Sequence, residues 1–480
     1  MEAKIVDNLQ LIKDRIAANY DEMITTLQEL VRINSEIATP QKDKPFGKGV
    51  DDAFLYMLKK GEEDGFLTTN IDHYGGHIDM LSKDSSNTET MGILAHLDVV
   101  PAGDGWEFDP YGAIIDNGKL YGRGSSDDKG PTIAAYFAMR AIKDAGITLN
   151  KNVRLILGLD EESGWQGMDY YLSKIPKPAD FGFTPDGDFP VVNGEKGILN
   201  FDIAKKFTKA VGKGIELRSF NGGNAPNMVP DYARLVLRSD DPSVYEELKL
   251  KAKKSRENGV LIKTKGVGKS FEITAHGVSA HGATPEKGIN AISLLMDFVK
   301  DIEFSNESVN EFIDFYNNEI AFQLDGENLG IGFSDEISGK TVVNVGVIEL
   351  DTKSARLAVN LRYPVSFDEE NIYDAMGEIL MKYNIGVVKK MSRDPIYIDE
   401  DDKLIKTMID VYRKNTGDKE AKPLVMGGGT YARALDNFVA FGALFPGEEE
   451  LFHQKNEYIS IDSLKKATLI YAETIYELCK

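Results

Sequence analysis

The chain has 480 residues, of which 42% are hydrophobic and 28% are charged, the composition of a globular protein. Its net charge of −21 argues against nucleic acid or an anionic membrane as a partner, because either would need a basic surface. The single cysteine, Cys479, excludes an internal disulfide and favours a reducing compartment. The N-terminal segment MEAKIVDNLQ has no signal pattern, and no segment is long enough to cross a membrane. We therefore expect a cytoplasmic protein.

The first part of the chain alternates helical segments with short apolar runs. Apolar residues at helical spacing predict an amphipathic helix over 23–31. The runs MGILAHLDVV (91–100) and VRLILGL (153–159) predict buried strands, and PTIAAYFAMRAIKDAG (131–146) predicts a helix between them. Strand, helix and strand at this spacing indicate a βαβ unit and a parallel sheet.

The pattern changes near residue 198, where the segments indicate a more antiparallel α+β region. Its expected strands are ILNFDIAKKF, ARLVLRS, KSFEITAHG, VVNVGVIEL and ARLAVNLRYP, and its expected helix covers 291–302. The earlier pattern returns near residue 390, with a helix over 403–414, a strand over 438–445 and a last helix over 463–478.

These patterns predict an α/β fold in which one domain is interrupted by another. The discontinuous domain, residues 1–197 and 388–480, should hold a mainly parallel sheet flanked by helices. The inserted domain, residues 198–387, should be α+β.

His96 and Asp98, in AHLDVV, share one face at the end of an expected strand. Open α/β sheets place their sites at such strand ends. A carboxylate beside a histidine is also a metal-ligand arrangement, in which the carboxylate orients the imidazole. A partly exposed histidine beside a helix-capping aspartate is the simpler alternative.

The loop YGRGSSDDKGP (121–131) precedes the expected helix, so Asp127 or Asp128 could simply cap that helix. Its glycine spacing is not that of a P-loop or a dinucleotide fingerprint, and two aspartates would repel phosphate. A Gly-rich loop that presents an acidic ligand is the alternative.

Three further segments place polar residues at or soon after expected strands. They are LDEES with Asp160, Glu161 and Glu162, FTPDGDFP with Asp186 and Asp188, and LFHQKNE with His453. A solvated turn is the alternative for the first segment and an ordinary Pro-Asp-Gly turn for the second, and none of the three is decisive alone. Together they gather nitrogen and oxygen donors without cysteine, which fits Zn²⁺, Mn²⁺ or Co²⁺. One shared carboxylate would be enough for a pair of ions, and an adjacent carboxylate could serve as a general base.

Six motifs in this order resemble the M20 family of dinuclear metallopeptidases over nearly the whole chain. Among its members, the PepV-type bacterial dipeptidases, which are similar to carnosinases, agree best. The motifs are AHLDVVPAGDGW, GRGSSDDKGP, LDEES, TPDGDFP, SAHGATPEKGIN and LFHQKNE. The resemblance implies a catalytic α/β domain interrupted by a lid domain.

The resemblance also implies two divalent ions, with Zn²⁺ as the first choice and Mn²⁺ or Co²⁺ as alternatives. The implied ligands are His96, Asp127 and Asp186 for one ion, and Glu162, His453 and the shared Asp127 for the other. Asp127 is chosen over Asp128 because the family's ligand lies two residues before a lysine, here Lys129. Asp98 would orient His96.

Glu161 would be the general base that takes a proton from a water bridging the ions and passes it to the leaving amine. His281, in SAHGATP, would help to hold the oxyanion, with His276 as a lesser candidate. Asn227 and Arg362 would grip the terminal carboxylate of the substrate.

Gly428, in MGGGTYAR, would contact the substrate through its backbone. Asp160, Thr430 and Arg433 have no assigned role. The implied activity is hydrolysis of dipeptides with free termini by a monomer. An aminoacylase or a succinyl-diaminopimelate desuccinylase is the nearest alternative, although the long inserted segment favours the dipeptidase.

Two alternatives come from other classes, a non-catalytic metal-binding or scaffold protein and a phosphoesterase. The intact Glu161 argues against the first, and the six motifs argue against the second. The native metal and the preferred dipeptides stay open.

Overall fold

The structure, a computed structural model, describes residues 7–84, 86, 88–208 and 213–480. The chain forms two compact units. The first unit comprises Met1–Asn193, Ile398–Leu424 and Gly429–Lys480, and the second comprises Gly194–Tyr397 and Val425–Gly428. The segment expected as an inserted domain, 198–387, lies within the second unit.

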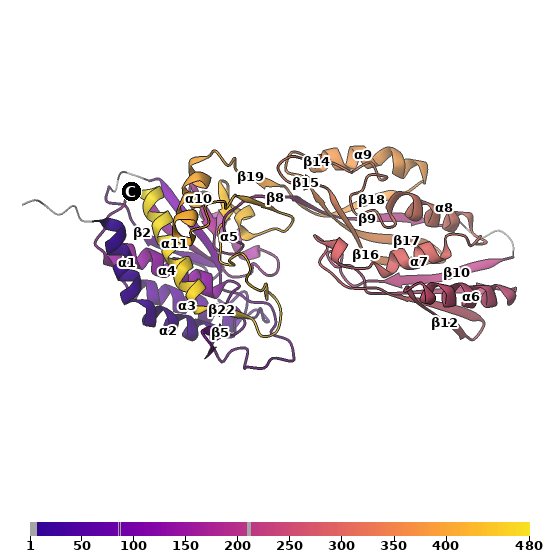
Figure 1. The fold of residues 1–480 in the computed structure, drawn as a ribbon, viewed down its shortest axis with the longest axis horizontal. Helices are drawn as coiled ribbons and strands as arrows, with labels where there is room; N and C mark the ends of the chain where they lie inside the picture. Colours follow the sequence, from indigo (N-terminus) through magenta and orange to yellow (C-terminus); the bar gives the residue numbers. More distant parts are fainter. Residues whose placement is uncertain (1–6, 85, 87, 209–212) are drawn as a thin grey trace, which may run out of the picture. The chain divides into compact units, whose positions relative to one another are not determined.

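A twisted sheet forms the centre of the first unit (Figure 1). β3 pairs in parallel with both β6 and β7, and β21 pairs in parallel with β7, whereas β1 and β2 add an antiparallel edge. The strands lie in the order β1 (Leu67–Ile71), β2 (Gly75–Met80), β6 (Asn152–Gly158), β3 (Thr90–His96), β7 (Phe181–Thr184), β21 (Phe438–Ala440) and β8 (Val192–Glu195). The expected βαβ unit and parallel sheet are confirmed.

Helices flank this sheet. α4 packs against β3 and β6 and is itself covered by α11, while α5 contacts β2. The helices of this unit are α1 (Asn8–Ala18), α2 (Tyr20–Val31), α3 (Lys48–Glu63), α4 (Lys129–Asp144), α5 (Gln166–Lys174), α10 (Lys403–Thr416) and α11 (Ile461–Cys479), with a 3₁₀ turn at Tyr431–Ala434.

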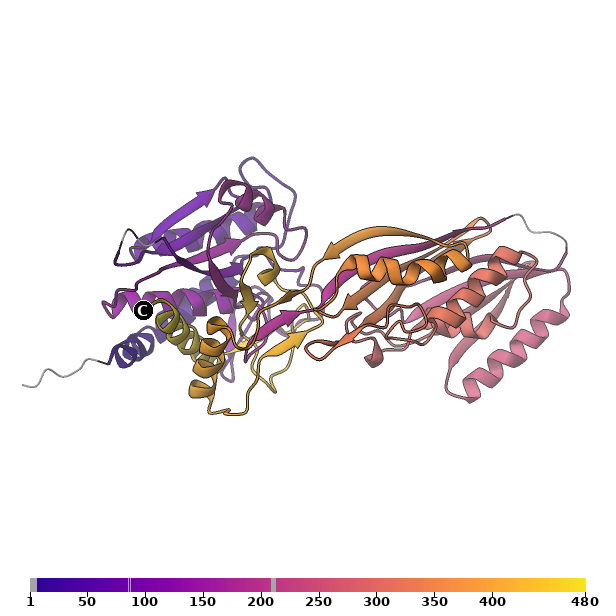
Figure 2. The same ribbon diagram turned by 90° about the horizontal axis from the view of Figure 1, so that it is seen from above.

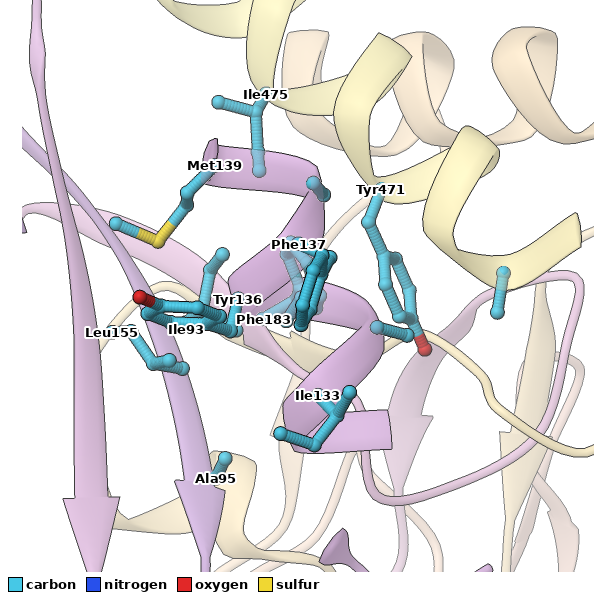
Figure 3. Close-up of a cluster of buried hydrophobic side chains, with 14 of the residues drawn as sticks. Ile93, Ala95, Ile133, Tyr136, Phe137, Met139, Leu155, Phe183, Tyr471 and Ile475 are labelled. Atoms are coloured by element: carbon cyan, nitrogen blue, oxygen red, sulfur yellow. The ribbon is translucent and has the colours of Figure 1, made fainter. Parts of the chain in front are cut away.

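Because α4 lies between the sheet and α11, it is apolar on nearly all its sides. Figure 3 shows Ile133, Phe137 and Met139 of α4 between strand residues and Ile475 of α11. Residues of β3, β6 and β7 complete this core from the sheet side. The loop that carries Asp127 directly precedes this helix.

A small three-stranded sheet brings the C-terminal segment to the Gly-rich loop. β5 (Lys119–Tyr121) pairs antiparallel with β4 (Ile114–Asp116) and with β22 (Tyr458–Ser460). Tyr458 lies opposite Tyr121, and the N–H of Gly122 donates to the carbonyl of Glu457 at 3.0 Å. Segments more than 300 residues apart in the sequence thereby lie side by side.

Two expected strands are shorter than the apolar runs suggested. The strand expected over 91–100 ends at His96, since the chain then leaves the sheet and Val99 donates its N–H to the carbonyl of Ser35. The strand expected over 438–445 is wrong beyond Ala440, because Gly442, with φ +83°, turns the chain away.

The second unit is an eight-stranded antiparallel sheet with helices, which confirms the expected α+β character. Its strands lie in the order β12 (Leu261–Val267), β13 (Ser270–His276), β11 (Tyr232–Ser239), β10 (Ile215–Gly222), β16 (Val342–Asp351), β17 (Ser354–Tyr363), β9 (Gly197–Lys206) and β18 (Gly386–Arg393). All five strands expected here from the sequence are present.

The helices of the second unit share one hydrophobic core with the sheet, and Figure 2 shows α9, in orange, running along the strands. They are α6 (Ser243–Glu257), α7 (Ala291–Val299), α8 (Glu307–Phe315) and α9 (Glu369–Lys382), with a 3₁₀ turn at Pro285–Lys287 and a π-helical turn at Tyr316–Ile320. The short strands are β14 (Ser334–Asp335), β15 (Gly339–Lys340), β19 (Ile396–Tyr397) and β20 (Leu424–Met426), the last beginning in the first unit.

Within the described part of the chain, no helix is both long enough and apolar enough to span a lipid bilayer.

Candidate metal centre

Histidine and carboxylate side chains meet at one edge of the parallel sheet. His96 is the last residue of β3, Glu161 and Glu162 follow the end of β6, and Asp186 follows the end of β7. Parallel neighbours end at the same edge, so these side chains are brought together by the topology. Asp127 comes from the loop before α4.

Asp127 lies between two histidines. Its Oδ1 is 3.1 Å from Nε2 of His96, and its Oδ2 is 3.2 Å from Nε2 of His453. The same nitrogen of His453 is 3.1 Å from the Glu162 carboxylate, and Nε2 of His96 is 3.8 Å from Oδ2 of Asp186. The carboxylate of Asp127 therefore faces both histidines, one oxygen to each.

Two groups of three residues present atoms that could hold a cation. The ligand atoms of His96, Asp127 and Glu162 all lie within 4.8 Å of one another, as do those of His96, Glu161 and Asp186. Nitrogen and carboxylate oxygen donors without thiolate fit Zn²⁺, Mn²⁺ or Co²⁺. The residues present therefore fit a divalent-metal site. Glu161 belongs to the second group, although the sequence suggested a proton-carrying role for it.

The titration of these residues in the metal-free protein reflects crowded negative charge. Burial, with the neighbouring Asp127 carboxylate, raises the pKa of Asp186 to about 7. Burial also raises the pKa values of Glu161 and Glu162 above their ordinary range. Hydrogen bonds to Asp127 and Glu162 raise the pKa of His453 to about 10. A bound cation would offset this concentration of carboxylates.

Asp98 is fully buried and fixes the loop that carries the glutamates. Its two carboxylate oxygens accept the N–H groups of Glu161 and Glu162, each at 3.1 Å. Nδ1 of His96 lies 3.0 Å from the backbone carbonyl of Asp98 and 3.4 Å from its Oδ1. The residue expected to orient His96 holds the backbone of the two glutamates.

Asp160, which has no role assigned from the sequence, and Asp128, over which Asp127 is preferred as a ligand, both have structural contacts. Oδ1 of Asp160 accepts the N–H of Gly167 at the start of α5, and burial raises the pKa of Asp160 to about 6. Oδ2 of Asp128 accepts from the N–H of His96 at 3.1 Å and from Oγ1 of Thr132 at 3.2 Å. Asp128 occupies the N-cap position of α4 but makes no capping hydrogen bond with its side chain.

The remaining candidates lie in the second unit. His281 and Met228 form an isolated antiparallel β-bridge through their backbones, and the carbonyl of Asn227 accepts the N–H of Gly282 at 2.7 Å. Asn344 ties this segment to β16, because its amide donates to the carbonyl of Met228 at 2.9 Å. The structure therefore brings Asn227 and His281 together.

Arg362 lies on β17 of the same sheet and is 5% exposed, so it is a buried strand residue. Its Nε donates to Oδ1 of Asn360 at 3.2 Å. Gly428 is the last residue of the shorter of the two segments that make up this unit, Val425–Gly428. A Cβ atom on the preceding Gly427 would lie 3.6 Å from the Cβ of Ala283. The glycine loop, residues 427–429, therefore runs beside the segment that carries His281.

The sequence interpretation missed a buried ion pair beside the centre. Arg123 and Glu457 are 1% and 0% exposed, and Nη1 of Arg123 is 2.6 Å from Oε2 of Glu457. Glu457 ends the motif LFHQKNE, but charged residues in loops are usually solvated, and no periodicity marked this one as buried. Only its nearness to His453 in the sequence could have suggested it.

The fold and this cluster define a class of protein. Two histidines and several carboxylates at the carboxyl edge of a parallel sheet are typical of enzymes that use divalent metals for hydrolysis.

Comparison with known proteins identifies the family. The model of peptidase family M20/M25/M40 matches residues 92–477 of this chain. The chain belongs to this family and is a peptide hydrolase, which confirms the family expected from the six motifs.

The sequences of relatives align with this chain over nearly their whole length. A protein of Bacillus subtilis (strain 168), named "Putative dipeptidase YtjP", is 38% identical over 473 residues, which cover 96% of this chain and 98% of the relative. A "Putative dipeptidase" of Staphylococcus aureus (strain USA300) is 36% identical over 474 residues, covering 97% and 99%. The solved structure of human carnosine dipeptidase 1 shares the fold, with a TM-score of 0.57 at 17% identity and coverage of 98% and 99%.

Replacement of Asp186 by asparagine should stabilise the metal-free protein in a pH-dependent way. The unfolded carboxyl ionises near pH 4, whereas the folded one has a pKa of about 7, so the folded wild type loses stability as pH rises from 4 to 7. The advantage of Asp186→Asn should therefore grow from pH 5.5 to 7 and then level off. Thermal unfolding in a chelator, followed by the fluorescence of Trp106 and Trp165, measures it.

Both tryptophans lie in the first unit, so this signal reports that unit alone. An advantage that does not change between pH 5.5 and 8 would show that the carboxyl of Asp186 does not have the raised pKa described above.

Proposed function

We propose that this peptide hydrolase cleaves the peptide bond of dipeptides with free termini at a centre of two divalent ions. The observation that carries the proposal is the placement of Asp127, whose two oxygens each face one histidine. A carboxylate in this position is suited to two ions at once. The dipeptidase names of relatives that align over nearly the whole chain give the proposal its substrate class.

One ion would be held by His96, Asp127 and Asp186, and the other by Glu162, His453 and the shared Asp127. The donors are nitrogen and oxygen atoms, for which Zn²⁺ is the first choice and Mn²⁺ or Co²⁺ are alternatives. Such ions, when bound, would lower the pKa of a water molecule and polarise the carbonyl that is cleaved.

Glu161 is the proposed proton carrier. Its carboxyl group accepts the proton of the attacking water and passes it to the nitrogen of the leaving amine. Burial raises the pKa of Glu161, a direction that favours the return of the proton to the leaving amine. The hydrogen bond from its backbone N–H to Asp98, at 3.1 Å, holds it in register with Glu162.

The first unit is the proposed catalytic domain and the second the proposed lid. His281 would stabilise the oxyanion, Arg362 and Asn227 would bind the terminal carboxylate, and Gly428 would contact the substrate through its backbone. The grouping of His281, Asn227 and the glycine loop within the second unit supports a common role. The planar guanidinium of Arg362 is suited to a carboxylate.

We also propose a cytoplasmic monomer. Its single cysteine is free and buried, as suits a reducing compartment, and one chain carries every proposed site residue. Light scattering coupled to size-exclusion chromatography should give the mass of one chain. The mass of a stable dimer would contradict the monomer.

A turnover panel tests the substrate class. We expect hydrolysis of unmodified dipeptides, and at least tenfold lower kcat/KM for the same dipeptides with an amidated C-terminus, because a charge-assisted contact is worth roughly 1.5–3 kcal/mol. N-acyl amino acids and succinyl-diaminopimelate complete the panel. Activity on the acylated substrates alone would favour an aminoacylase or a desuccinylase and would exclude the dipeptidase.

Replacement of Glu161 by glutamine tests the proton carrier. We expect kcat to fall by about 10²–10⁴-fold, because a positioned general base contributes that much. Metal content, measured by elemental analysis after dialysis, should stay at the wild-type value. Loss of an ion in Glu161→Gln would instead make Glu161 a ligand, as its position near His96 and Asp186 also allows.

Asp160→Asn is the matched control for this experiment. It makes the same chemical change at the adjacent carboxylate, and an asparagine Oδ1 can still accept the N–H of Gly167. Its kcat should stay within about tenfold of the wild type. An equal loss in both variants would point to a general effect of charge rather than to proton transfer.

A further inference from the structure

Glu457 binds the loop that carries Asp127 through every polar contact that its carboxylate makes in the structure. Oε2 accepts from Nη1 of Arg123 at 2.6 Å and from the N–H of Gly124 at 3.1 Å. Oε1 accepts from the N–H of Ser126 at 2.9 Å, from its hydroxyl at 3.2 Å, and from the N–H of Asp127 at 3.2 Å. One side chain thus binds four of the five residues 123–127 of a glycine-rich loop.

This arrangement needs a carboxylate. Glu457 is fully buried, so water cannot replace any of these hydrogen bonds. All its partners are donors, and the amide NH₂ of a glutamine would face donors whichever way it turned. The guanidinium of Arg123, itself 1% exposed and 5.3 Å from the Trp106 ring, balances the charge.

Glu457 also connects the two segments that supply the centre. It follows His453 in the same short loop, and the next residue, Tyr458, pairs with Tyr121 just before the Gly-rich loop. The carbonyl of Glu457 accepts the N–H of Gly122 at 3.0 Å. Backbone and side chain of this one residue therefore hold the loop of Asp127 against the loop of His453.

We infer that Glu457 is the positioning residue of the metal centre, which fixes Asp127 between His96 and His453 so that one carboxylate can serve two ions. The inference rests on the proposed function, because it needs both ions. It assigns a role to a residue that contacts neither ion nor substrate. A loop of glycine and serine residues has little rigidity of its own, so the carboxylate of Glu457 supplies the order that Asp127 requires.

Glu457→Gln tests the inference. We expect the affinity for Zn²⁺ to fall by about 10- to 100-fold, as is typical when a residue that orients a ligand is lost. Competition with a chromophoric chelator at 25 °C measures the affinity, and elemental analysis measures the number of ions. Activity should recover as Zn²⁺ is added in excess, with KM for the dipeptide unchanged.

Glu473→Gln is the matched control. Glu473, on α11, is 2% exposed, pairs with the more exposed Lys414 and accepts from the amide of Asn415 at 2.9 Å, so this change also removes the charge of a buried, ion-paired carboxylate of the first unit. It should lower the unfolding temperature but leave Zn²⁺ affinity unchanged. Equal weakening of Zn²⁺ binding in both variants would overturn the inference, since general destabilisation would then explain it.

Glu457→Asp provides a milder change if Glu457→Gln does not fold. It keeps the charge opposite Arg123 but is one methylene too short to reach all the donors, so Zn²⁺ affinity should fall by an intermediate factor. Wild-type affinity in whichever variant folds would overturn the role of Glu457. A wild-type protein that binds no Zn²⁺, Mn²⁺ or Co²⁺ would instead contradict the proposed metal centre itself.

Discussion

Repulsion between carboxylates at one edge of the parallel sheet is the constraint on which the rest of the first unit depends. Asp127, Glu161, Glu162 and Asp186 lie close enough to shift one another's pKa values. Apolar surroundings alone could not hold these carboxylates together, because their mutual repulsion and their loss of hydration must be offset by opposite charges or hydrogen bonds. The protein supplies part of that compensation through His96 and His453 and leaves the remainder for cations. A site built in this way trades stability of the metal-free fold for affinity.

Backbone N–H groups supply the order that the repelling side chains cannot. Asp98 accepts two of them from the Glu161–Glu162 loop, and Glu457 accepts three from the Asp127 loop. The carboxylates of this site therefore fall into two groups with different roles. The carboxylates of Asp98 and Glu457 are held by N–H groups, while those facing the histidines keep oxygen lone pairs that could bind an ion.

The sequence could predict the edge of the sheet where these residues meet, because that depends on local properties. An apolar run ends, a polar residue follows, and parallel neighbours end together, as His96, Glu162 and Asp186 illustrate. The partners of Asp128 and Glu457 could not be predicted in the same way. Each depends on which N–H a carboxylate meets across the fold, and that information is not local.

The three carboxylates of LDEES have equal charge, but their side chains point in different directions and have different partners. Asp160 turns back to the start of α5, whereas Glu161 and Glu162 face the histidines. An equally acidic run, Glu62-Glu63-Asp64, lies at the end of α3 with both glutamates exposed to solvent. Composition alone therefore does not distinguish a solvated helix end from a metal centre. What distinguishes them is a preceding buried strand, which delivers the charges to a partly buried site beside two histidines.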